Sequence, residues 1–430
     1  MQLVPLIAAT YFMVSGGPYG IEDILGGAGY LKALLILLLV PLFWTLPTTL
    51  MIGELASSIP AEGGFYVWVR RALGPFWGYQ EAWLSLTASV FDMAIYPTIF
   101  VLYLGRFFPA WTAGHRGVLW ELLLVVACCL WNLRGARAVG EGSVWLFVTL
   151  LLPFAVLVVA GVWHGLHLPA QARFPAAHPE GGLSTAILVA MWNYMGWDNA
   201  STVAQEVQDP RRNYPRAMLL TAGLVALTYI LPLAAIAFAG LPLNEFSTGS
   251  WTDAAHILAG PLLAGAIVLG GTINGFGMFN ALMLSYTRLP MVLAEDGMLP
   301  RWLALRNRKG VPWAAVLVCG MAWAMALHFS FERLISIDLI LYGSSLVLEF
   351  IALAVLRIKE PQLERPFRAG NFAMACILGI APTLLIGYAM FSARDERMAH
   401  IPALAFGAIV AAFGPLFYMI GKASERRKGE

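Results

Sequence analysis

Long apolar stretches follow one another along almost the whole chain. Each is close to the length of about 20 residues that a helix needs to cross the hydrocarbon core of a bilayer. Charged residues make up only 12% of the chain, against about a quarter in a typical soluble protein. The twelve stretches are residues 3–28, 31–52, 75–104, 117–133, 141–163, 183–206, 214–239, 262–287, 311–329, 334–357, 371–392 and 400–421. The sequence therefore predicts an all-α membrane protein with twelve transmembrane helices, in which residues 1–430 form a single transmembrane domain.

The lysines and arginines are distributed unequally between the segments that join these stretches. With a cytoplasmic N-terminus, 20 of the 27 fall on the inner side and 7 on the outer side. Because cytoplasmic loops carry an excess of Lys and Arg, this distribution predicts cytoplasmic N- and C-termini in the cell membrane. The first stretch has no basic region before it and no small-residue cleavage site, so we expect it to remain as a membrane span.

Several classes of function are not supported by the composition. The cysteines lie inside apolar stretches, where they behave as small hydrophobic residues and predict neither a disulfide nor a metal site. Neither HExxH nor GxSxG occurs, so we expect no enzyme and no cofactor. No selectivity-filter motif indicates a channel, and a net charge of +2 gives no indication of nucleic-acid binding.

Two apolar stretches are interrupted by residues that disfavour a helix. SGGPYGIED, residues 15–23, places three glycines, a proline and two carboxylates in the first stretch. WNYMGWDNAS, residues 192–201, interrupts the sixth stretch with Gly196 and places Asp198 at membrane depth. Unwound backbone at that depth is stable only where protein or a wet cavity satisfies its polar groups. Both segments are therefore predicted to line a site inside the protein.

The two interruptions also predict an internal repeat. Interrupted helices at matching places in two halves of a membrane protein indicate inverted repeats with a binding site between them. We expect the first repeat at residues 1–163 and the second at residues 183–357. Two additional helices would follow at residues 371–421.

Seven carboxylates in the apolar stretches are candidates for charges at membrane depth, and no lysine or arginine lies near the middle of any stretch. They are Glu22, Asp23, Glu81, Asp92, Asp198, Asp338 and Glu349. A charge at membrane depth costs about 3 kcal/mol or more, so each carboxylate suggests a function. A set of unpaired carboxylates suits a cationic substrate, a proton, or both.

Structural explanations exist for four of these carboxylates. Glu22 and Asp23 open the second half of the first stretch, where a carboxylate stabilises the positive end of a helix. Glu81 lies near the inner end of its stretch and Asp338 near the outer end of its own. Contact with water alone could therefore explain both of these charges.

Two stretches carry polar residues on one helical face. Asp92 and Tyr96 are one turn apart, and a structural role for Asp92 is as plausible as a functional one. The second stripe is spaced four, three and four residues apart, and we expect it to line a cavity. It consists of Asp338, Tyr342, Ser345 and Glu349.

Aromatic residues surround the two interruptions. Tyr19, Trp192, Tyr194 and Trp197 could enclose an ammonium group through cation–π contacts. Aromatic side chains also pack membrane helices in the ordinary way, so they support a cationic ligand only together with the carboxylates.

These features belong to motifs that run almost from end to end of the chain. Besides the first interruption, the motifs are ELASSIPAEGGFYVWVRRALGPFWGYQEAW, NLRG, MGWDNASTVAQEVQDPRRNYPRA, AEDGMLP and LRIKEPQLERPFR. With them the chain resembles the amino acid–polyamine–organocation superfamily. The resemblance implies a LeuT-like fold of two inverted five-helix repeats, with helices 1 and 6 unwound at mid-membrane. SGGPYGIED, FDMAIYP and LYGSSLVLEF leading into LRIKEP resemble the polyamine-uptake branch.

The first interruption departs from the pattern of amino-acid carriers in that superfamily. Those carriers usually show G-[ST]-G, whose backbone N–H groups bind the α-carboxylate of the substrate. The matching residues here are Pro18, Tyr19 and Gly20, and proline has no N–H to donate. Glu22 would also repel a carboxylate nearby. The departure favours a substrate that carries only positive charge.

The resemblance implies roles for individual positions. Residues 17–20 and 193–196 would form the two unwound walls, Trp192 an aromatic gate, and Asp198 a contact with the substrate amine. The predicted substrate-binding residues are Gly17, Tyr19, Gly20, Glu22, Asp92, Tyr96, Trp192, Asn193, Tyr194, Gly196, Trp197, Asp198 and Tyr342.

The function implied is import of polyamines such as putrescine or spermidine by alternating access. The alternative is an amino-acid carrier or exchanger of the same fold, perhaps for cationic amino acids. Proton symport is the expected drive, although residues 141–163 lack the lysine that some proton-coupled relatives carry. A carboxylate would then take the proton, and Glu22, Asp92 and Glu349 are the candidates. The expected partners are a small cationic substrate, protons and the lipid bilayer, without nucleic acid or an obligate subunit.

Overall fold

Helices make up most of the protein. The computed structural model describes residues 1–175, 182–242, 246–327, 331–398 and 400–429. The α-helices are α1 (Leu3–Val14), α2 (Glu22–Val40), α3 (Leu46–Ser58), α4 (Gly64–Leu73), α5 (Pro75–Phe107), α6 (Pro109–Thr112), α7 (His115–Asn132), α8 (Ala136–Leu166), α9 (Leu183–Asn193), α10 (Pro210–Phe238), α11 (Trp251–Ala259), α12 (Pro261–Tyr286), α13 (Arg288–Glu295), α14 (Trp313–Met325), α15 (Phe331–Lys359), α16 (Phe372–Leu378), α17 (Ile380–Ser392) and α18 (Ala403–Gly429). The π segment is η1 (Pro41–Thr45), and the 3-10 segments are η2 (Ala170–Ala172), η3 (Trp197–Thr202), η4 (Ala204–Glu206), η5 (Arg301–Ala304) and η6 (Ala393–Asp395). Two short strands, β1 (Arg397–Met398) and β2 (Ile401–Pro402), pair antiparallel.

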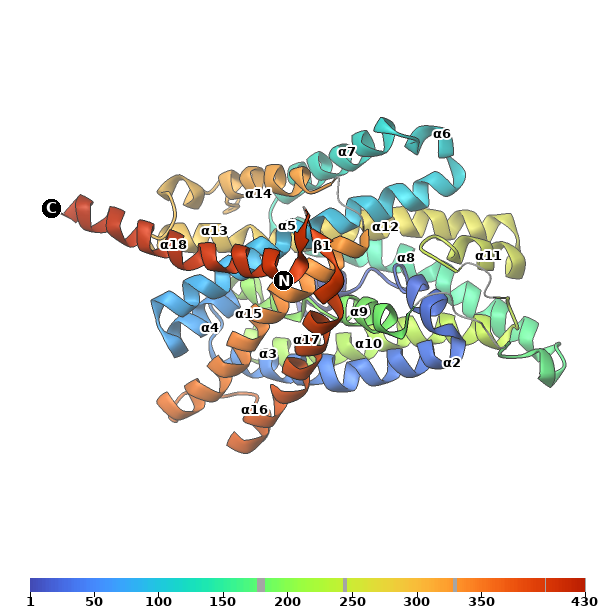
Figure 1. The fold of residues 1–430 in the computed structure, drawn as a ribbon, viewed down its shortest axis with the longest axis horizontal. Coiled ribbons are helices and arrows are strands. Elements are labelled where there is room, and N and C mark those ends of the chain that lie inside the picture. The colour runs from blue at the N-terminus through green and yellow to red at the C-terminus, as the bar shows by residue number, and fades with distance from the viewer. Residues whose placement is uncertain (176–181, 243–245, 328–330, 399, 430) are drawn as a thin grey trace.

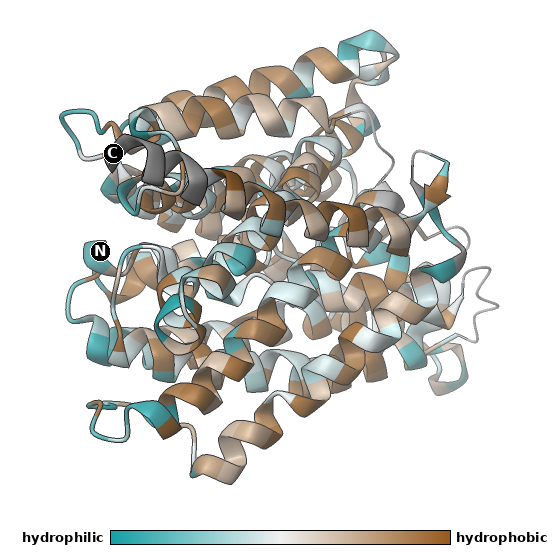
Figure 2. Cartoon of the chain, turned by 60° about the vertical axis from the view of Figure 1, so that its left-hand side comes forward, coloured by the Kyte–Doolittle hydropathy of each residue, from teal (hydrophilic) through white to brown (hydrophobic). Residues whose placement is uncertain are grey.

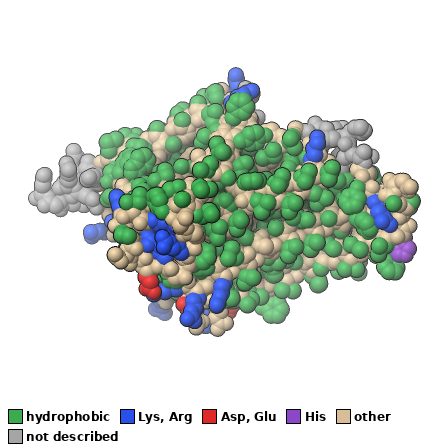
Figure 3. All heavy atoms as spheres, turned by 90° about the horizontal axis from the view of Figure 1, so that it is seen from below, with side chains coloured by type: hydrophobic (Ala, Val, Ile, Leu, Met, Phe, Trp, Pro, Cys, Tyr) green, Lys and Arg blue, Asp and Glu red, His purple; other side chains and the backbone are tan. Residues whose placement is uncertain are grey.

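The arrangement of the helices suits a bilayer. Most of the long helices lie side by side along the longest axis of the molecule (Figure 1). Polar residues are concentrated in loops at the two ends, and apolar residues cover the helices between them (Figure 2). Figure 3 shows a broad apolar face on which most charged side chains gather at one end. Only structures whose backbone is satisfied internally, such as helices, can cross the hydrocarbon core.

Among the described residues, eight helical segments are long and apolar enough to cross a membrane. They coincide with eight of the predicted stretches and confirm a multi-pass helical membrane protein. The other four predicted stretches, 3–28, 117–133, 183–206 and 311–329, contain α1, α7, α9 and α14. The boundary between the first two stretches is a kink inside α2 at Gly29, where φ is 74°.

Both predicted interruptions are present. α1 ends at Val14, and α2 begins only at Glu22. α9 ends at Asn193, and the chain continues from Gly196 into the 3-10 segment η3. In the following text, residues 15–21 are the first break and residues 194–196 the second break.

The two breaks touch each other through glycines. Gly196 has φ 87°, a conformation that favours glycine, and a Cβ at this position would lie 2.6 Å from the Met13 carbonyl oxygen. The side-chain amide of Asn193 donates a hydrogen bond to the Gly20 carbonyl at 3.3 Å. Segments more than 170 residues apart are thus held together where their helices open.

Ion pairs join the segments at the end of the molecule where Figure 1 labels α4 and α13. Arg288 is almost fully buried and pairs with Glu206 and, at 3.3 Å, with Glu62. Arg306 contacts Glu62 at 3.3 Å as well. The α-amino group of Met1 donates to the Glu206 carbonyl. These contacts close the space beneath the second break.

A buried ion pair ties α3 to the end of α15. The Arg357 guanidinium donates to both oxygens of Glu54, at 2.9 and 2.5 Å, and only 1% of Glu54 is exposed. Arg365 contacts the same carboxylate at 3.3 Å, and the Ala369 N–H donates to it at 2.8 Å. The bidentate geometry and the extra donor are what a buried pair needs to offset its desolvation.

Replacing Glu54 by alanine should destabilise the protein by about 3–5 kcal/mol, because Arg357 would remain buried without its carboxylate. The measurement is the apparent melting temperature of the detergent-solubilised protein. The control is Glu141→Ala, which removes an ion pair with Arg137 at the surface. That pair is exposed to solvent, so its loss should leave the melting temperature unchanged. Equal shifts in both variants would contradict the role of Glu54.

Candidate functional site

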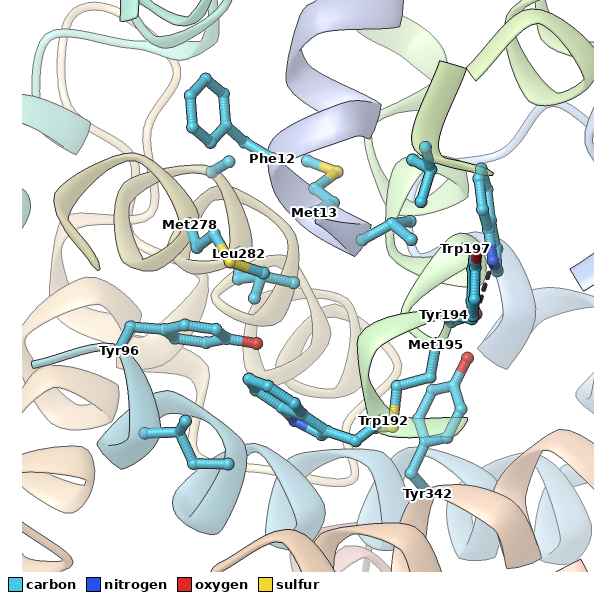
Figure 4. Packing of buried hydrophobic residues seen from close by; sticks show 14 of the residues in the cluster. Phe12, Met13, Tyr96, Trp192, Tyr194, Met195, Trp197, Met278, Leu282 and Tyr342 are labelled. Atoms are coloured by element: carbon cyan, nitrogen blue, oxygen red, sulfur yellow. Dashed lines mark hydrogen bonds between the residues drawn. The ribbon is translucent and has the colours of Figure 1, made fainter. Parts of the chain in front are cut away.

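A small cavity lies where the two breaks meet α5 and α12. Its free volume is about 10 Å³, which is room for about one water molecule. Figure 4 shows the rings of Tyr96 and Trp192 beside each other, with methionine side chains around them. The lining residues are Met13, Val14, Tyr19, Asp92, Tyr96, Trp192, Asn193, Met195, Gly196, Met278 and Tyr286.

Asp92 is the carboxylate that lines this cavity. It lies on α5, and Tyr96 one turn further on donates to it at 2.6 Å. Tyr286 of α12 donates to its other oxygen at 3.2 Å. The Tyr96 ring also stacks on Trp192 at 6.3 Å between centroids, with 26° between the planes. A carboxylate beside two stacked aromatic rings offers both charge and cation–π contact to an ammonium group.

Asp198 lies directly behind the second break. The Tyr342 hydroxyl on α15 donates to Asp198 at 2.6 Å and accepts the Gly196 N–H at 3.1 Å. One tyrosine thus satisfies the unwound backbone and holds the carboxylate next to it. The predicted stripe on α15 therefore faces the second break.

Asp338, one turn before Tyr342 on that stripe, is fully buried. The expectation that water alone could explain its charge is wrong, because no part of the side chain reaches the surface. Neither carboxyl oxygen has a hydrogen-bond partner, and the group interacts electrostatically with Asp92 and Asp198. Of these three buried aspartates, which come from α5, η3 and α15, only Asp92 lines the cavity.

Glu22 and Asp23 face a different segment. Glu22 accepts hydrogen bonds from the Gly20 N–H at 2.6 Å, from the Gly249 N–H at 2.9 Å and from the Tyr103 hydroxyl. Asp23 accepts the Thr248 hydroxyl at 2.8 Å. Both carboxylates therefore tie the start of α2 to residues 248–249, and Glu22 does not line the cavity.

Glu81 and Glu349 are also fully buried. For Glu81 the expectation of contact with interfacial water is wrong, because no part of its side chain is exposed. Ser85 donates to one of its oxygens at 2.9 Å, while both oxygens of Glu349 lack a hydrogen-bond partner. Neither residue lines the cavity.

The structure brings together part of the predicted substrate-binding set. Those that line the cavity are Tyr19, Asp92, Tyr96, Trp192, Asn193 and Gly196. Those that do not line it are Gly17, Gly20, Glu22, Tyr194, Trp197, Asp198 and Tyr342. Two of the latter mainly support the fold: Tyr194 donates to the Leu37 carbonyl at 2.9 Å, and Trp197 donates to the Tyr194 carbonyl at 2.8 Å.

None of the ion pairs among the described residues involves Glu22, Glu81, Asp92, Asp198, Asp338 or Glu349. Hydroxyl and N–H donors stabilise some of them, but they add no positive charge. Buried negative charges that lie close together cannot all remain ionised unless cations or protons compensate them. The site is therefore suited to receive positive charge.

Two tyrosines at this site were absent from the sequence-based set. Tyr103 belongs to the same face of α5 as Asp92 and Tyr96, since the spacings of four and seven residues keep one helical face. Extending the stripe of Asp92 and Tyr96 along the helix would have identified Tyr103. Tyr286 is the last residue of α12, a helix without acidic or basic residues, where nothing in the sequence distinguishes it from a packing residue.

Comparison with known proteins identifies the family. A family model described as amino acid permease matches residues 7–415. Polyamine transporter PUT1 of Oryza sativa subsp. japonica is 32% identical over 414 residues, which cover 95% of this chain and 77% of the relative. A probable polyamine transporter of Arabidopsis thaliana is 35% identical over 405 residues, covering 92% of this chain and 83% of the relative. The serine/threonine exchanger SteT of Bacillus subtilis (strain 168) is 26% identical over 399 residues, covering 89% and 86%. Because the family match extends over nearly the whole chain, this protein belongs to the amino acid permease family, within the superfamily that its motifs resemble.

Proposed function

We propose that this protein is a secondary active transporter that imports polyamines by alternating access. The observation that carries the proposal is Asp92 in an aromatic cavity together with the buried Asp198 and Asp338, none of which forms an ion pair with any described residue. A polyamine carries several ammonium groups on an apolar chain. It would compensate these charges and place its methylene groups against the aromatic rings and methionines.

The relatives support this substrate class. Both plant proteins described above are named as polyamine transporters, and each aligns with more than nine tenths of this chain. The substrate would bind at the predicted set of residues, with Asp338 added as a further carboxylate. Asp92 and Asp198 would hold ammonium groups directly.

The proposed architecture has twelve transmembrane helices. Residues 1–163 and 183–357 would form two inverted five-helix repeats, and residues 371–421 two further helices. The interruptions of α1–α2 and α9–η3 support this arrangement, because each falls in the first helix of its repeat. The excess of basic residues on one side supports cytoplasmic termini in the cell membrane.

The segments next to the breaks would also move during alternating access. The contacts of Glu22 with Tyr103 and Gly249 would close the outer side, and the pairs of Arg288 with Glu206 and Glu62 the inner side. Opening either set would expose the cavity to one side only. Proton symport would drive accumulation, with Glu22, Asp92 and Glu349 as candidate proton carriers.

An amino-acid carrier or exchanger is the second candidate, and the relationship to SteT supports it. The hydrogen bonding of the first break argues against it. The Gly17 N–H donates to the Ser15 hydroxyl at 3.1 Å, and the Gly20 N–H donates to Glu22. Pro18 has no N–H, so these three positions offer no donor to an α-carboxylate.

Uptake into proteoliposomes distinguishes the two candidates. Radiolabelled putrescine should accumulate under an inward proton gradient, with unlabelled spermidine as a competitor. Serine and arginine are the amino acids to compare. Transport of either amino acid with no response to putrescine would rule out the polyamine assignment.

Asp92→Asn and Asp198→Asn should each weaken putrescine binding by about 2 kcal/mol or more, roughly 30-fold in Kd, because an ammonium group would lose its carboxylate. Binding is measured by titration of the purified protein. Glu121→Gln is the control, since Glu121 is a buried acid of α7 outside the site. Unchanged affinity in both aspartate variants would refute their assignment.

The adjacent carboxylates Glu22 and Asp23 allow a second comparison of binding between two variants. Glu22→Gln should weaken putrescine binding by roughly tenfold or more, because an ammonium group entering beside the first break would lose a charged acceptor. Asp23→Asn should change affinity by less than about threefold, since Asp23 serves the contact with residue 248. If the two variants lost affinity equally, Glu22 would have no specific role in binding.

A further inference from the structure

An apolar groove lies between α15 and the two short helices α16 and α17. Its free volume is about 390 Å³, within the range of about 300–1,000 Å³ that small-molecule sites cover. Val347, Phe350, Ile351 and Ala354 line it from α15, and their spacings of three, one and three residues place them on one helical face. At about 100° per residue, this face is opposite to the polar stripe that faces the second break. The groove is therefore separate from the cavity at the breaks.

A glycine brings the walls of this groove together. α16 ends at Leu378 and α17 begins at Ile380, and a Cβ at Gly379 between them would lie 3.0 Å from the Cβ of Phe350. The missing side chain lets the junction approach α15 closely. Figure 1 shows α16 at the lower edge of the molecule, so the groove is open to the outside. The exposed residues of its lining include Ile351, Ile380 and Leu384.

The surroundings of the groove are those of the lipid. Its two walls belong to segments long and apolar enough to cross a membrane, Leu334–Lys359 and Phe372–Ser392. The α15 part of the lining is seven residues long, or about 10 Å, against about 15 Å for the hydrocarbon of one leaflet. The Thr383 hydroxyl donates to the Gly379 carbonyl at 2.7 Å, so it is already satisfied. The lining thus offers van der Waals contact without polar demands, which suits an acyl chain.

Basic residues lie at one end of the groove, where both of its walls end. Arg357, one turn beyond Ala354, donates to the Gly370 carbonyl at 3.1 Å and to the Asn371 carbonyl. These bonds hold the loop before α16 against the end of α15. Arg368 lies on this loop, two residues before Gly370. It is exposed and forms no ion pair with any described residue.

The charge of residues 357–368 and their ion-pair partners is positive. Three carboxylates belong to this group, and each is paired with at least one arginine. Six basic residues accompany them, which leaves a net charge of +3. Basic groups between membrane helices bind anionic lipid head groups, and a guanidinium can bind phosphate through two N–H groups. The nine residues are Glu54, Glu360, Glu364, Arg71, Arg211, Arg357, Lys359, Arg365 and Arg368.

We infer that the groove between α15 and α16–α17 is a binding site for an anionic phospholipid. One acyl chain lies in the groove, and the phosphate of the head group lies against the Arg368 guanidinium. A second copy of this chain fits the groove less well. A two-fold axis along the membrane normal would place two basic segments at the same membrane surface, where they repel each other.

Mass spectrometry of the intact, detergent-solubilised full-length protein tests the head-group contact. The probes are phosphatidylglycerol and phosphatidylcholine with identical acyl chains. One phosphatidylglycerol should bind about tenfold more tightly than phosphatidylcholine. Arg368→Gln should remove this preference, whereas Arg137→Gln, which changes an exposed arginine of α8, should preserve it. Equal binding of the two lipids to the wild-type protein would overturn the anionic site.

Filling the groove tests the acyl-chain contact. Ala354→Phe places a ring in the groove and should weaken binding of both lipids at least about tenfold. Val159→Phe is the control, because Val159 is an exposed residue of α8 outside the groove. Wild-type binding of phosphatidylglycerol by Ala354→Phe would overturn the inference. A dimer that Ala354→Phe dissociates, without loss of lipid, would overturn it as well and assign the groove to a second copy.

Cys376 locates the lipid without any change in the groove. It lines the groove and is exposed, whereas the other three cysteines are buried. Phosphatidylglycerol should slow the reaction of Cys376 with N-ethylmaleimide in detergent at least about threefold more than phosphatidylcholine does. Arg368→Gln should abolish this difference. Val159→Cys in the Cys376→Ala protein should react at the same rate with either lipid.

Equal protection of Cys376 by both lipids would overturn the inference, even if Ala354→Phe did not fold. None of these measurements involves a transported substrate. Their outcome is therefore independent of the proposed transport function.

Discussion

A carboxylate held away from water needs a proton, a donor or a cation, and this protein buries several carboxylates between helices that open at mid-length. Glu54 has two arginines beside it and serves as a fixed structural contact. Asp92, Asp198 and Asp338 have no ion-pair partner among the described residues, and Asp92 lines the cavity beside the breaks. The difference follows from the ligands available: a paired carboxylate stabilises the fold, whereas an uncompensated one retains affinity for an external cation.

Tyrosine hydroxyls make these buried charges compatible with a folded protein. Tyr96 and Tyr286 donate to Asp92, Tyr342 to Asp198 and Tyr103 to Glu22. A neutral donor lowers the cost of burial but leaves the negative charge in place. A cation can therefore still gain energy on binding. The Tyr342 hydroxyl also accepts the Gly196 N–H of the second break, so one residue contacts both a buried carboxylate and the unwound backbone.

The sequence predicted the positions of both breaks because glycine and proline act locally on the backbone. It also predicted the polar stripe on α15, since four- and three-residue spacings place side chains on one face. Two expectations about solvent were wrong: Glu81 and Asp338 lie near the ends of apolar stretches, yet both are fully buried. Distance along a helix indicates depth in the bilayer, but it does not show which neighbouring helix covers a side chain.

The sequence by itself determined that this chain is a helical membrane protein. It also determined the positions at which two of its helices are interrupted, and that acids without nearby basic residues lie at membrane depth. These are properties of apolar length, backbone preference and local charge. Only the tertiary structure decided which acid lines the cavity and which acids bind other segments. The contact of Glu22 with Gly249, the donation of Tyr286 to Asp92 and the donation of Tyr342 to Asp198 all join residues about 140 to 230 positions apart. Such contacts arise from how helices pack, and no local rule of sequence contains that information.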